Sequence, residues 1–436
     1  MKSRWEEDML QKLSILSAAL RKYFRTSALT AAGSALLLAG GPAAAEQPPD
    51  EMFAPTKAIT LPSPQNITNF DNSFVDPVIG QYFLADRTNK AVDVVDTDTD
   101  TARNTLATQL KATPPFAGFT GSNNTSGPNG VITVGHKEVW AGDGDSTIKV
   151  ISLVTGATIR VINTGGTNRA DELCLDPRDK LVMMANPAET PFPFVTLIST
   201  ETYSVLKTIV MDGTAGTPKA TNGIKHCQWN PRTGKFYLDI PEVNGPGDDS
   251  APGAVLVISP DVVIPGTALI ENTFNLPIDK CAGPMGMAIG PENQILLGCQ
   301  ATTSSVIINA RSGSIIATLD NEGLTGAGGV WFNEGDSHYF VANNESNFSS
   351  NQLLGVVDAW SHQLDQSVVT GFKTVLRGSN HTVAADPVLN QVYVPIASTS
   401  STSSSTICGS LRGGSNTRGC IAVFTANGDD KPRPSQ

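Results

Sequence analysis

The sequence predicts an all-β fold, a seven-bladed β-propeller of four-stranded antiparallel blades, and three observations support this prediction. One pattern recurs in seven imperfect copies, spaced roughly 40–60 residues apart. Each copy contains short runs that alternate apolar and polar residues and are rich in β-branched and aromatic side chains, as strands are. No window after residue 45 shows a sustained helical period.

Each copy reads as a hairpin followed by a third strand. In the first copy the runs are "SFVDP", "QYFLAD" and "AVDVVDT", with a turn containing Pro and Gly between the first two. Several copies add a fourth run, such as "TGATIRVINTG", "TYSVLKTIVMDG" and "SGSIIATLDNEG". The copies begin at Asn69, Gly127, Arg169, Asn222, Gly283, Gly326 and Ser379.

The last copy ends at "CIAVFTANGDD" without an obvious fourth strand, and an orphan strand over Lys57–Ser63 precedes the first copy. Pairing this N-terminal strand with the last blade would close the ring. Closure removes the unpaired strand edge that a linear array would expose. We therefore expect the N-terminal strand to complete the seventh blade.

The N-terminus resembles a signal peptide. Basic residues up to Arg25 precede the apolar stretch "ALTAAGSALLLAGG" and the small residues "PAAAEQ", which predicts cleavage between Ala45 and Glu46. No later segment is long and apolar enough to span a bilayer. We expect a periplasmic or secreted monomer without an integral membrane segment. Its predicted parts are a signal peptide over 1–45, a linker over 46–56, the propeller over 57–425 and a tail over 426–436.

The charge balance disfavours nucleic acid as a partner. The whole chain has a net charge of −11. Residues 1–45 carry six basic and three acidic side chains, so the chain after cleavage has a net charge of −14. Such a protein repels phosphate backbones and anionic lipid headgroups.

Export makes the six cysteines candidates for disulfides. Proximity in the predicted hairpins and neighbouring repeats favours three pairs: Cys408 with Cys420, Cys281 with Cys299, and Cys174 with Cys227. The alternative for the last pair is two buried free thiols.

The residue that opens each innermost strand should point at one mouth of the central channel. These positions are Asp71, Asn129, Asp171, Lys225, Met285, Gly328 and His381. In the fourth copy a second register places His226 inward instead of Lys225. Carboxylates and amides favour Ca²⁺ or Mg²⁺, and histidines shift the preference towards Zn²⁺, Mn²⁺ or Fe²⁺. The alternative is a hydrated mouth whose polar groups bind water and backbone.

The repeated wording, an apolar run with Asp-Pro followed by "VYV", as in "TVAADPVLNQVYVP", resembles the YVTN/NHL-type seven-bladed propellers. It is also similar to the senescence-marker-protein, gluconolactonase and strictosidine-synthase-like group. The resemblance spans about residues 57–425. It implies the propeller fold, and in the gluconolactonase-like group it implies a metal held at the channel mouth by a Glu, two Asn and an Asp.

Several residues match that metal-binding pattern. Asn129 in "GPNGV", Asp171 in "ADELCLDP" and Asn222 in "TNGI" resemble its Asn and Asp positions. The "G-E-S-P" glutamate motif is missing, and the first copy offers Asp71 there, with Glu172 as a possible substitute. The resemblance thus implies a divalent metal (Ca, Zn, Mn or Fe) and the following ligand set: Asp71, Asn129, Asp171, Glu172 and Asn222.

Two functions remain open at this stage. One is an exported binding or scaffold module that takes a small molecule or a protein partner at the channel mouth. The other is a metal-dependent, lactonase-like hydrolase or a lyase, in which His226 or His381 acts as general base. No G-x-S-x-G, CxxCH or HExxH motif is present in the sequence, so serine hydrolase, c-type haem and zincin chemistry lack support.

Overall fold

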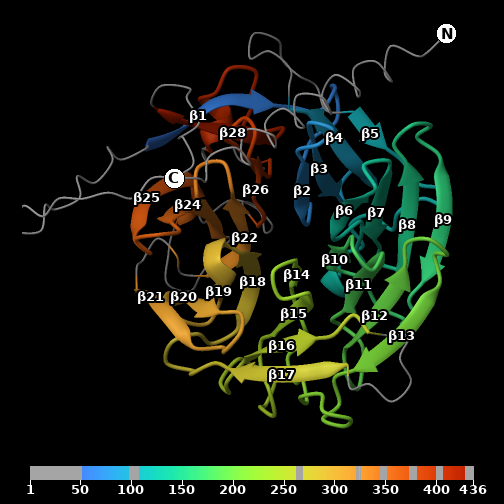
Figure 1. Cartoon of the computed structure of the whole chain (residues 1–436). Coiled ribbons are helices and arrows are strands. Elements are labelled where there is room, and N and C mark those ends of the chain that lie inside the picture. The colour runs from blue at the N-terminus through green and yellow to red at the C-terminus, as the bar shows by residue number, and fades with distance from the viewer. Residues whose placement is uncertain are drawn as a thin grey trace, which may run out of the picture. The chain divides into compact units, whose positions relative to one another are not determined.

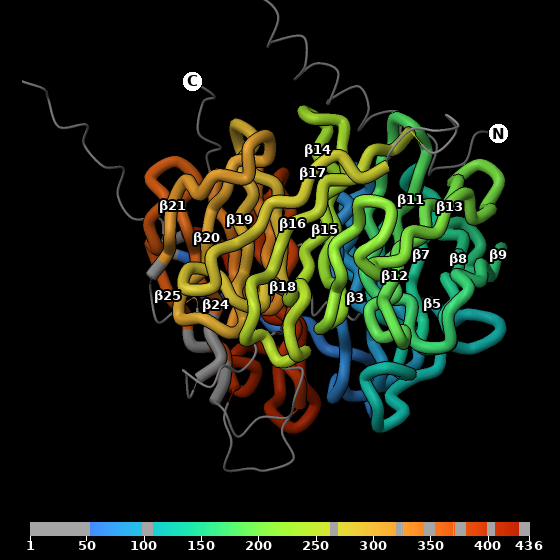
Figure 2. Tube along the Cα trace, turned by 90° about the horizontal axis from the view of Figure 1, so that it is seen from below, coloured from blue at the N-terminus to red at the C-terminus, as the bar shows by residue number. Residues whose placement is uncertain are grey.

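The computed structural model describes residues 52–97, 108–261, 269–320, 324, 326–343, 351–372, 381–398 and 406–427. These residues form seven four-stranded antiparallel sheets arranged in a ring, which confirms the predicted propeller (Figure 1). The innermost strands of neighbouring blades contact each other around the whole ring. Seen from below, β13, β17 and β21 lie on the outer wall (Figure 2).

The first four blades follow the sequence order from the inside outwards. Blade 1 contains β2 (Ser73–Asp76), β3 (Gln81–Asp86), β4 (Ala91–Asp96) and β5 (Thr108–Leu110). Blade 2 contains β6 (Val131–Val134), β7 (Glu138–Gly142), β8 (Thr147–Ser152) and β9 (Thr158–Asn163). Blade 3 contains β10 (Leu173–Asp176), β11 (Leu181–Asn186), β12 (Phe194–Ser199) and β13 (Val205–Val210). Blade 4 contains β14 (Cys227–Asn230), β15 (Lys235–Ile240), β16 (Ala254–Ile258) and β17 (Ile270–Asn275).

The remaining blades follow the same order until the last. Blade 5 contains β18 (Pro284–Ile289), β19 (Gln294–Cys299), β20 (Ser304–Asn309) and β21 (Ile315–Asp320). Blade 6 contains β22 (Ala327–Asn333), β23 (His338–Asn343), β24 (Asn351–Asp358) and β25 (Leu364–Phe372). Blade 7 contains β26 (Ala384–Asp386), β27 (Gln391–Ile396), β28 (Cys420–Asn427) and, as its outermost strand, β1 (Met52–Ile59).

In blades 1, 3, 4 and 7 the Asp or Asn that ends the first run accepts a backbone hydrogen bond within the following turn. The carboxylate Oδ1 of Asp76 accepts the backbone N–H of Val78 at 3.1 Å, and Asn230 Oδ1 accepts that of Arg232 at 2.9 Å. Asp176 and Asp386 make the same contact in blades 3 and 7. The intervening residue is proline in these turns, which fixes its backbone and has no N–H to satisfy. The recurring Asp-Pro or Asn-Pro pair therefore ends the innermost strand and reverses the chain.

The N-terminal strand closes the ring, as the sequence predicts. β1 pairs antiparallel with β28 from Met52 opposite Asn427 to Ile59 opposite Ile421. The strand covers Met52–Ile59 rather than the expected Lys57–Ser63, so it begins five residues earlier and ends four residues earlier than predicted. Pro55 does not break the strand, because it lies on an outermost strand beside a register shift.

All three predicted disulfides are confirmed: Cys174–Cys227, Cys281–Cys299 and Cys408–Cys420. The first joins the innermost strands of blades 3 and 4, and the second lies within blade 5. The third ties the 3-10 turn Ile407–Gly409 to β28. Disulfides of this kind are typical of proteins in oxidising compartments. Among the described residues no helix is long and apolar enough to cross a membrane. Residues 1–51, including the predicted signal peptide, lie outside the described part.

The Cys174–Cys227 bridge should contribute more stability than the Cys408–Cys420 bridge, because it closes a chain segment of 53 residues rather than 12. We expect the Cys174→Ala/Cys227→Ala variant to lose about 4 kcal/mol of unfolding free energy, and the Cys408→Ala/Cys420→Ala variant about 3 kcal/mol. Urea denaturation followed by tryptophan fluorescence measures both. An equal or larger loss in the second variant would contradict this ranking.

Candidate functional site

The central channel contains a cavity of about 440 Å³ to which all seven blades contribute lining residues. Its lining changes character along the channel axis. Asn72, Glu172 and His226, which precede the innermost strands, line it with polar groups. Farther along the strands the lining is aromatic, with Trp229 and Trp331 among its residues. The cavity is therefore amphipathic, as small-molecule pockets commonly are.

The predicted ring positions in the first four blades occupy equivalent places. The backbone N–H of Asp71 donates to the carbonyl of Ala85 at 2.9 Å, and that of Asp171 donates to Ala185 at the same distance. Asn129 and Lys225 make the matching bonds in blades 2 and 4. These bonds extend the first hairpin of each of these blades beyond the innermost strand. They fix the backbone positions from which the ring side chains project.

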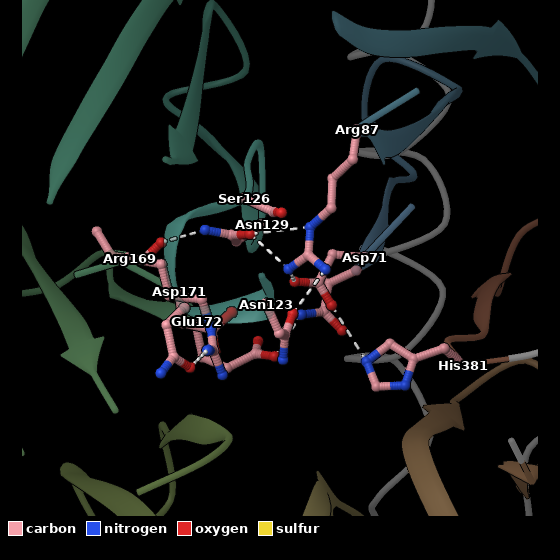
Figure 3. Close-up of polar contacts among 12 residues, drawn as sticks. Asp71, Arg87, Asn123, Ser126, Asn129, Arg169, Asp171, Glu172 and His381 are labelled. Atoms are coloured by element: carbon pink, nitrogen blue, oxygen red, sulfur yellow. Dashed lines mark hydrogen bonds and ion pairs between the residues drawn. The ribbon is translucent and has the colours of Figure 1, made fainter. Parts of the chain in front are cut away.

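Two buried arginines, which the sequence analysis did not identify, occupy the centre of this ring (Figure 3). The guanidinium of Arg87 forms an ion pair with Asp71. Its Nε and Nη2 donate to Asn129 Oδ1 at 3.1 and 2.6 Å, and its Nη1 donates to Asn123 Oδ1 at 2.8 Å. Asn129 in turn donates from Nδ2 to the carbonyl of Ala170 at 2.8 Å. Arg87 thus links blades 1 and 2.

Arg169 plays the corresponding part beside blade 3. Its Nε donates to Asp171 Oδ2 at 2.7 Å, and its Nη1 donates to Asn124 Oδ1 at 3.0 Å. Asn124 belongs to the short 3-10 turn η1 (Asn123–Thr125) in the loop before β6. The sequence signal was available, because Arg87 directly follows a strand-ending Asp and Arg169 lies two residues before Asp171. It was missed because neither residue opens an innermost strand.

The negative charge of Asp71 lies near three basic side chains, those of Arg87, His381 and Arg169. His381 of blade 7 places Nε2 3.1 Å from Asp71 Oδ1, on the side away from Arg87. Burial alone would raise the pKa of Asp71, but Arg87, followed by His381 and Arg169, lowers that pKa well below its usual range. Asp71 is therefore ionised and internally compensated.

Glu172 has the opposite character. Its Oε1 accepts a hydrogen bond from Asn72 Nδ2 and lies 3.2 Å from Nε2 of His226. Burial, then the charges of Asp171 and Asp71, raises the pKa of Glu172 well above its usual range. The shift favours the protonated carboxyl, which in that form can donate a hydrogen bond into the cavity.

The imidazole of His226 is oriented by backbone. Its Nδ1 contacts the carbonyl oxygen of Met285 in blade 5, so Nδ1 carries a hydrogen and donates it. Nε2 is then the nitrogen that faces Glu172. One proton can move between the Glu172 carboxyl and His226 Nε2, which makes the pair a candidate acid–base unit.

A third carboxyl lies behind this pair. Asp239 is fully buried, and burial raises its pKa well above the usual range, with Glu172 adding to the effect. Burial, then the charge of Arg169, lowers the pKa of the neighbouring Lys225. Both shifts reduce the charge around the polar end of the cavity, because each favours the neutral form of its group.

The structure thus brings together four of the five residues of the predicted metal set. Asp71, Asn129 and Asp171 offer oxygens that already accept from guanidinium groups, so a cation bound among them would have to displace Arg87 and Arg169. Glu172 lies nearby in the cavity lining. Asn222 bonds instead to Asp249 Oδ1 at 2.8 Å, in the loop before β16. The metal set stays a prediction, as do the catalytic roles expected for His226 and His381.

A separate group with possible metal-ligating atoms lies in blade 6. In the described residues, one ligand atom each from His338, Asp358 and Asp365 lies within 4.8 Å of the others. The sequence analysis missed this group, because its members are spread over three strands and share no motif. Register alone brings two of them together, since His338 pairs directly with Asp358 across β23 and β24.

Comparisons with known proteins support the fold and leave the function open. No protein-family model and no curated protein matches this chain. Among solved structures, a chain in the crystal structure of the mitotic checkpoint complex is 11% identical, with a TM-score of 0.56. The match covers 90% of this chain and 98% of that chain. At this identity the likeness shows only the propeller fold. The resemblance to the YVTN/NHL-type and gluconolactonase-like groups therefore stays a prediction.

Removing Arg87 should destabilise the protein strongly, because it leaves the carboxylate of Asp71 buried with less compensation. We expect Arg87→Met to lower the unfolding free energy by about 3–5 kcal/mol. The exposed Arg311→Met is the matched control and should change it by less than about 0.5 kcal/mol. Urea denaturation measures both. The double variant Asp71→Asn/Arg87→Met should recover part of the loss, and a double variant no better than Arg87→Met would contradict this account.

The raised pKa of Glu172 predicts a specific pH dependence of stability. The unfolded chain ionises this carboxyl near its ordinary pKa of 4.5, whereas the folded protein keeps it protonated to higher pH. Its contribution is therefore complete below pH 4.5 and is lost as the pH rises towards the folded-state pKa. We expect Glu172→Gln to remove this loss, so that the stability of the variant relative to the wild type increases as the pH rises above 4.5 in thermal denaturation.

The control for this experiment is Glu242→Gln. Glu242 accepts backbone N–H groups of Gly247 and Asp248, which lower its pKa against the effect of burial. Its contribution is present above the ordinary pKa and lost as the pH falls, so this variant should lose stability at neutral pH. Two variants with the same pH profile would contradict the assignment.

Proposed function

We propose that this chain is an exported binding module that takes a small, uncharged, amphipathic molecule into its central channel. The observation that carries the proposal is the cavity of about 440 Å³, polar at Glu172 and His226 and aromatic farther along. Cavities of a few hundred Å³ with apolar walls and a few placed polar groups are typical small-molecule sites. The signal-peptide pattern of the sequence and the three disulfides support export.

The electrostatics of the polar end favour an uncharged head group. Arg87 and Arg169 each lie against their own carboxylate, from Asp71 and Asp171. The raised pKa of Glu172 favours the neutral form of its carboxyl group. A charged ligand group would therefore lose hydration without gaining an opposite charge. A carbonyl, hydroxyl or lactone group would instead find a donor in Glu172 and a further polar partner in His226.

The aromatic end favours a flat apolar body. Phe74 of blade 1 and Trp331 of blade 6 meet edge to face, with ring centroids 5.8 Å apart. Blade 7 lies between these blades, and its innermost strand offers only Ala384, Ala385 and Asp386, so the two rings meet past small side chains. Trp229 adds a further ring, over which Arg178 lies at 5.2 Å. Stacking against such rings is favourable for aromatic ligands.

The Glu172–His226 pair supports a second candidate, an acid–base enzyme of lyase type. Nε2 of His226 lies 3.2 Å from Glu172, at the surface of the cavity where a ligand's polar group would bind. In this role His226 would remove a proton and Glu172 would supply one. Turnover of a bound ligand that stops in His226→Gln but not in His381→Gln would favour this candidate over simple binding.

Binding can be tested with 7-hydroxycoumarin, an aromatic lactone that accepts excitation energy from tryptophan. We expect saturable quenching of tryptophan emission and at least tenfold weaker binding in Trp331→Ala, because that ring forms part of the apolar wall. Trp360→Ala is the matched control, since Trp360 is 56% exposed and does not line the cavity. Circular dichroism checks that both variants fold.

Two outcomes would contradict the proposed function. Saturable binding that Trp331→Ala and Glu172→Gln leave unchanged would place the ligand elsewhere. No saturable binding of this probe or of a set of neutral aromatic carbonyl and phenol fragments would show that the cavity is not a site for this class.

A further inference from the structure

We propose that blade 6 carries a Zn²⁺ site, formed by Nε2 of His338 and the carboxylates of Asp358 and Asp365, which fastens the N-terminal closing strand. The site lies outside the central cavity and is independent of the proposed ligand. It rests on the geometry of three neighbouring strands and on their contacts with β1.

The three side chains gather at one end of blade 6. His338 is the first residue of β23 and pairs with Asp358, the last residue of β24. Asp365 is the second residue of β25, which pairs with β24 through Leu364 opposite Val357. Nε2 of His338 lies 3.2 Å from Oδ2 of Asp365. Ligands about 2.1 Å from a tetrahedral ion are about 3.4 Å apart, so this pair already fits one edge of a zinc site.

A second carboxylate lies beside the other nitrogen of the imidazole, at a distance longer than a hydrogen bond. Nδ1 of His338 lies 3.5 Å from Oδ1 of Asp336, and the backbone N–H of His338 donates to the same oxygen at 3.0 Å. Metal-bound histidines commonly direct their other nitrogen at a carboxylate in this way. Asp336 is 5% exposed, and its Oδ2 is a buried oxygen without a hydrogen-bond partner in the described part of the chain. A cation on the far side of the imidazole would offset that buried negative charge.

The other ligands are also held in place. Asp358 Oδ1 accepts the backbone N–H groups of Trp360 and Ser361 at 2.9 and 2.6 Å, which fixes its carboxylate at the end of β24. The imidazole of His338 is 2% exposed and packs against the rings of Phe53 and Phe340, with centroids 5.7 and 6.4 Å away. Asp365 is solvent-exposed, so an ion could enter from that side and keep water in its open position.

The ligand set favours Zn²⁺ over Ca²⁺. One imidazole and two carboxylates make a borderline donor set with three protein ligands, and such sets suit zinc with a bound water. Calcium prefers six to eight oxygen ligands and gains nothing from an imidazole. Mn²⁺ fits the same donors but binds more weakly in the usual affinity order.

The site contacts the strand that closes the ring. Gln366 follows Asp365 and takes both backbone groups of Phe53: Phe53 N–H donates to Oε1 at 2.7 Å, and Nε2 donates to the Phe53 carbonyl at 2.9 Å. The ring of Phe53 lies against His338 itself. An ion that immobilises His338 and Asp365 therefore stabilises both the side-chain and the backbone contacts of β1.

The experiment uses the full exported chain, stripped with a chelator and then titrated with ZnCl₂, CaCl₂ or MnCl₂. We expect one Zn²⁺ per chain by elemental analysis. Some β1 amides should exchange their hydrogen only when the metal site opens. At a free Zn²⁺ concentration a hundred times the dissociation constant, the exchange of these amides should slow by about a hundredfold. Calcium should not have this effect. A zinc-edge X-ray absorption spectrum should show one imidazole and oxygen ligands.

Variants locate the ion. Asp365→Asn and His338→Gln should each weaken Zn²⁺ binding at least tenfold, and the exposed position of Asp365 makes its variant the safer one for folding. His136→Gln is the matched control, because His136 contacts a single carboxylate, Asp76, in another blade. Zinc binding that survives Asp365→Asn, that is lost in Glu172→Gln, or that leaves exchange in β1 unchanged would overturn the proposal. Binding of 7-hydroxycoumarin should be the same with and without zinc. Failure of the zinc proposal would therefore leave the proposed ligand site in the channel untouched, and the reverse also holds.

Discussion

The antiparallel pairing of β1 with β28 is the constraint on which the rest of the structure depends. A strand from the N-terminal end of the propeller completes the sheet made by its C-terminal end, so the edge of β28 is paired and blade 7 has four strands like the others. Closure also brings blade 7 against blade 1. Only then can His381 reach Asp71, and Ser73 bond to Thr382 at 3.1 Å. The channel mouth is therefore a product of ring closure and not of any single blade.

Closure of the ring brings polar residues together where the innermost strands begin. Their buried charges are compensated by other side chains of the same chain. Arg87 and Arg169 place guanidinium groups against Asp71, Asn129 and Asp171, and the turn η1 supplies two further amide oxygens. Buried charges are stable only when paired and hydrogen-bonded in this way. Among the ring positions predicted from the sequence, Asp71, Asn129 and Asp171 thus serve to join blades 1, 2 and 3.

The sequence predicts the apolar and covalent parts of the fold well, because these depend on short-range patterns. Alternating runs and Asp-Pro turns predict seven blades, and proximity of repeats predicts three disulfides correctly. The start of β1 was predicted five residues too late, because the apolar pattern does not show that the strand continues through Pro55 to Met52. Arg87 was missed because it does not open an innermost strand, and the blade 6 cluster was missed because its members lie on three strands and share no motif.

The residues that directly follow the predicted ring positions are the better candidates for a functional role. Asp71, Asn129 and Asp171 do not line the cavity, whereas the residues that follow two of them, Asn72 and Glu172, do. The first set of residues forms internal ion pairs and hydrogen bonds. The second set faces the cavity with a carboxyl of raised pKa and an imidazole held by a backbone carbonyl. The carboxylates of these ion pairs have a second effect, because the charges of Asp171 and Asp71 add to burial in raising the pKa of Glu172. A substitution at Asp71 or Asp171 should therefore also change the pKa of Glu172.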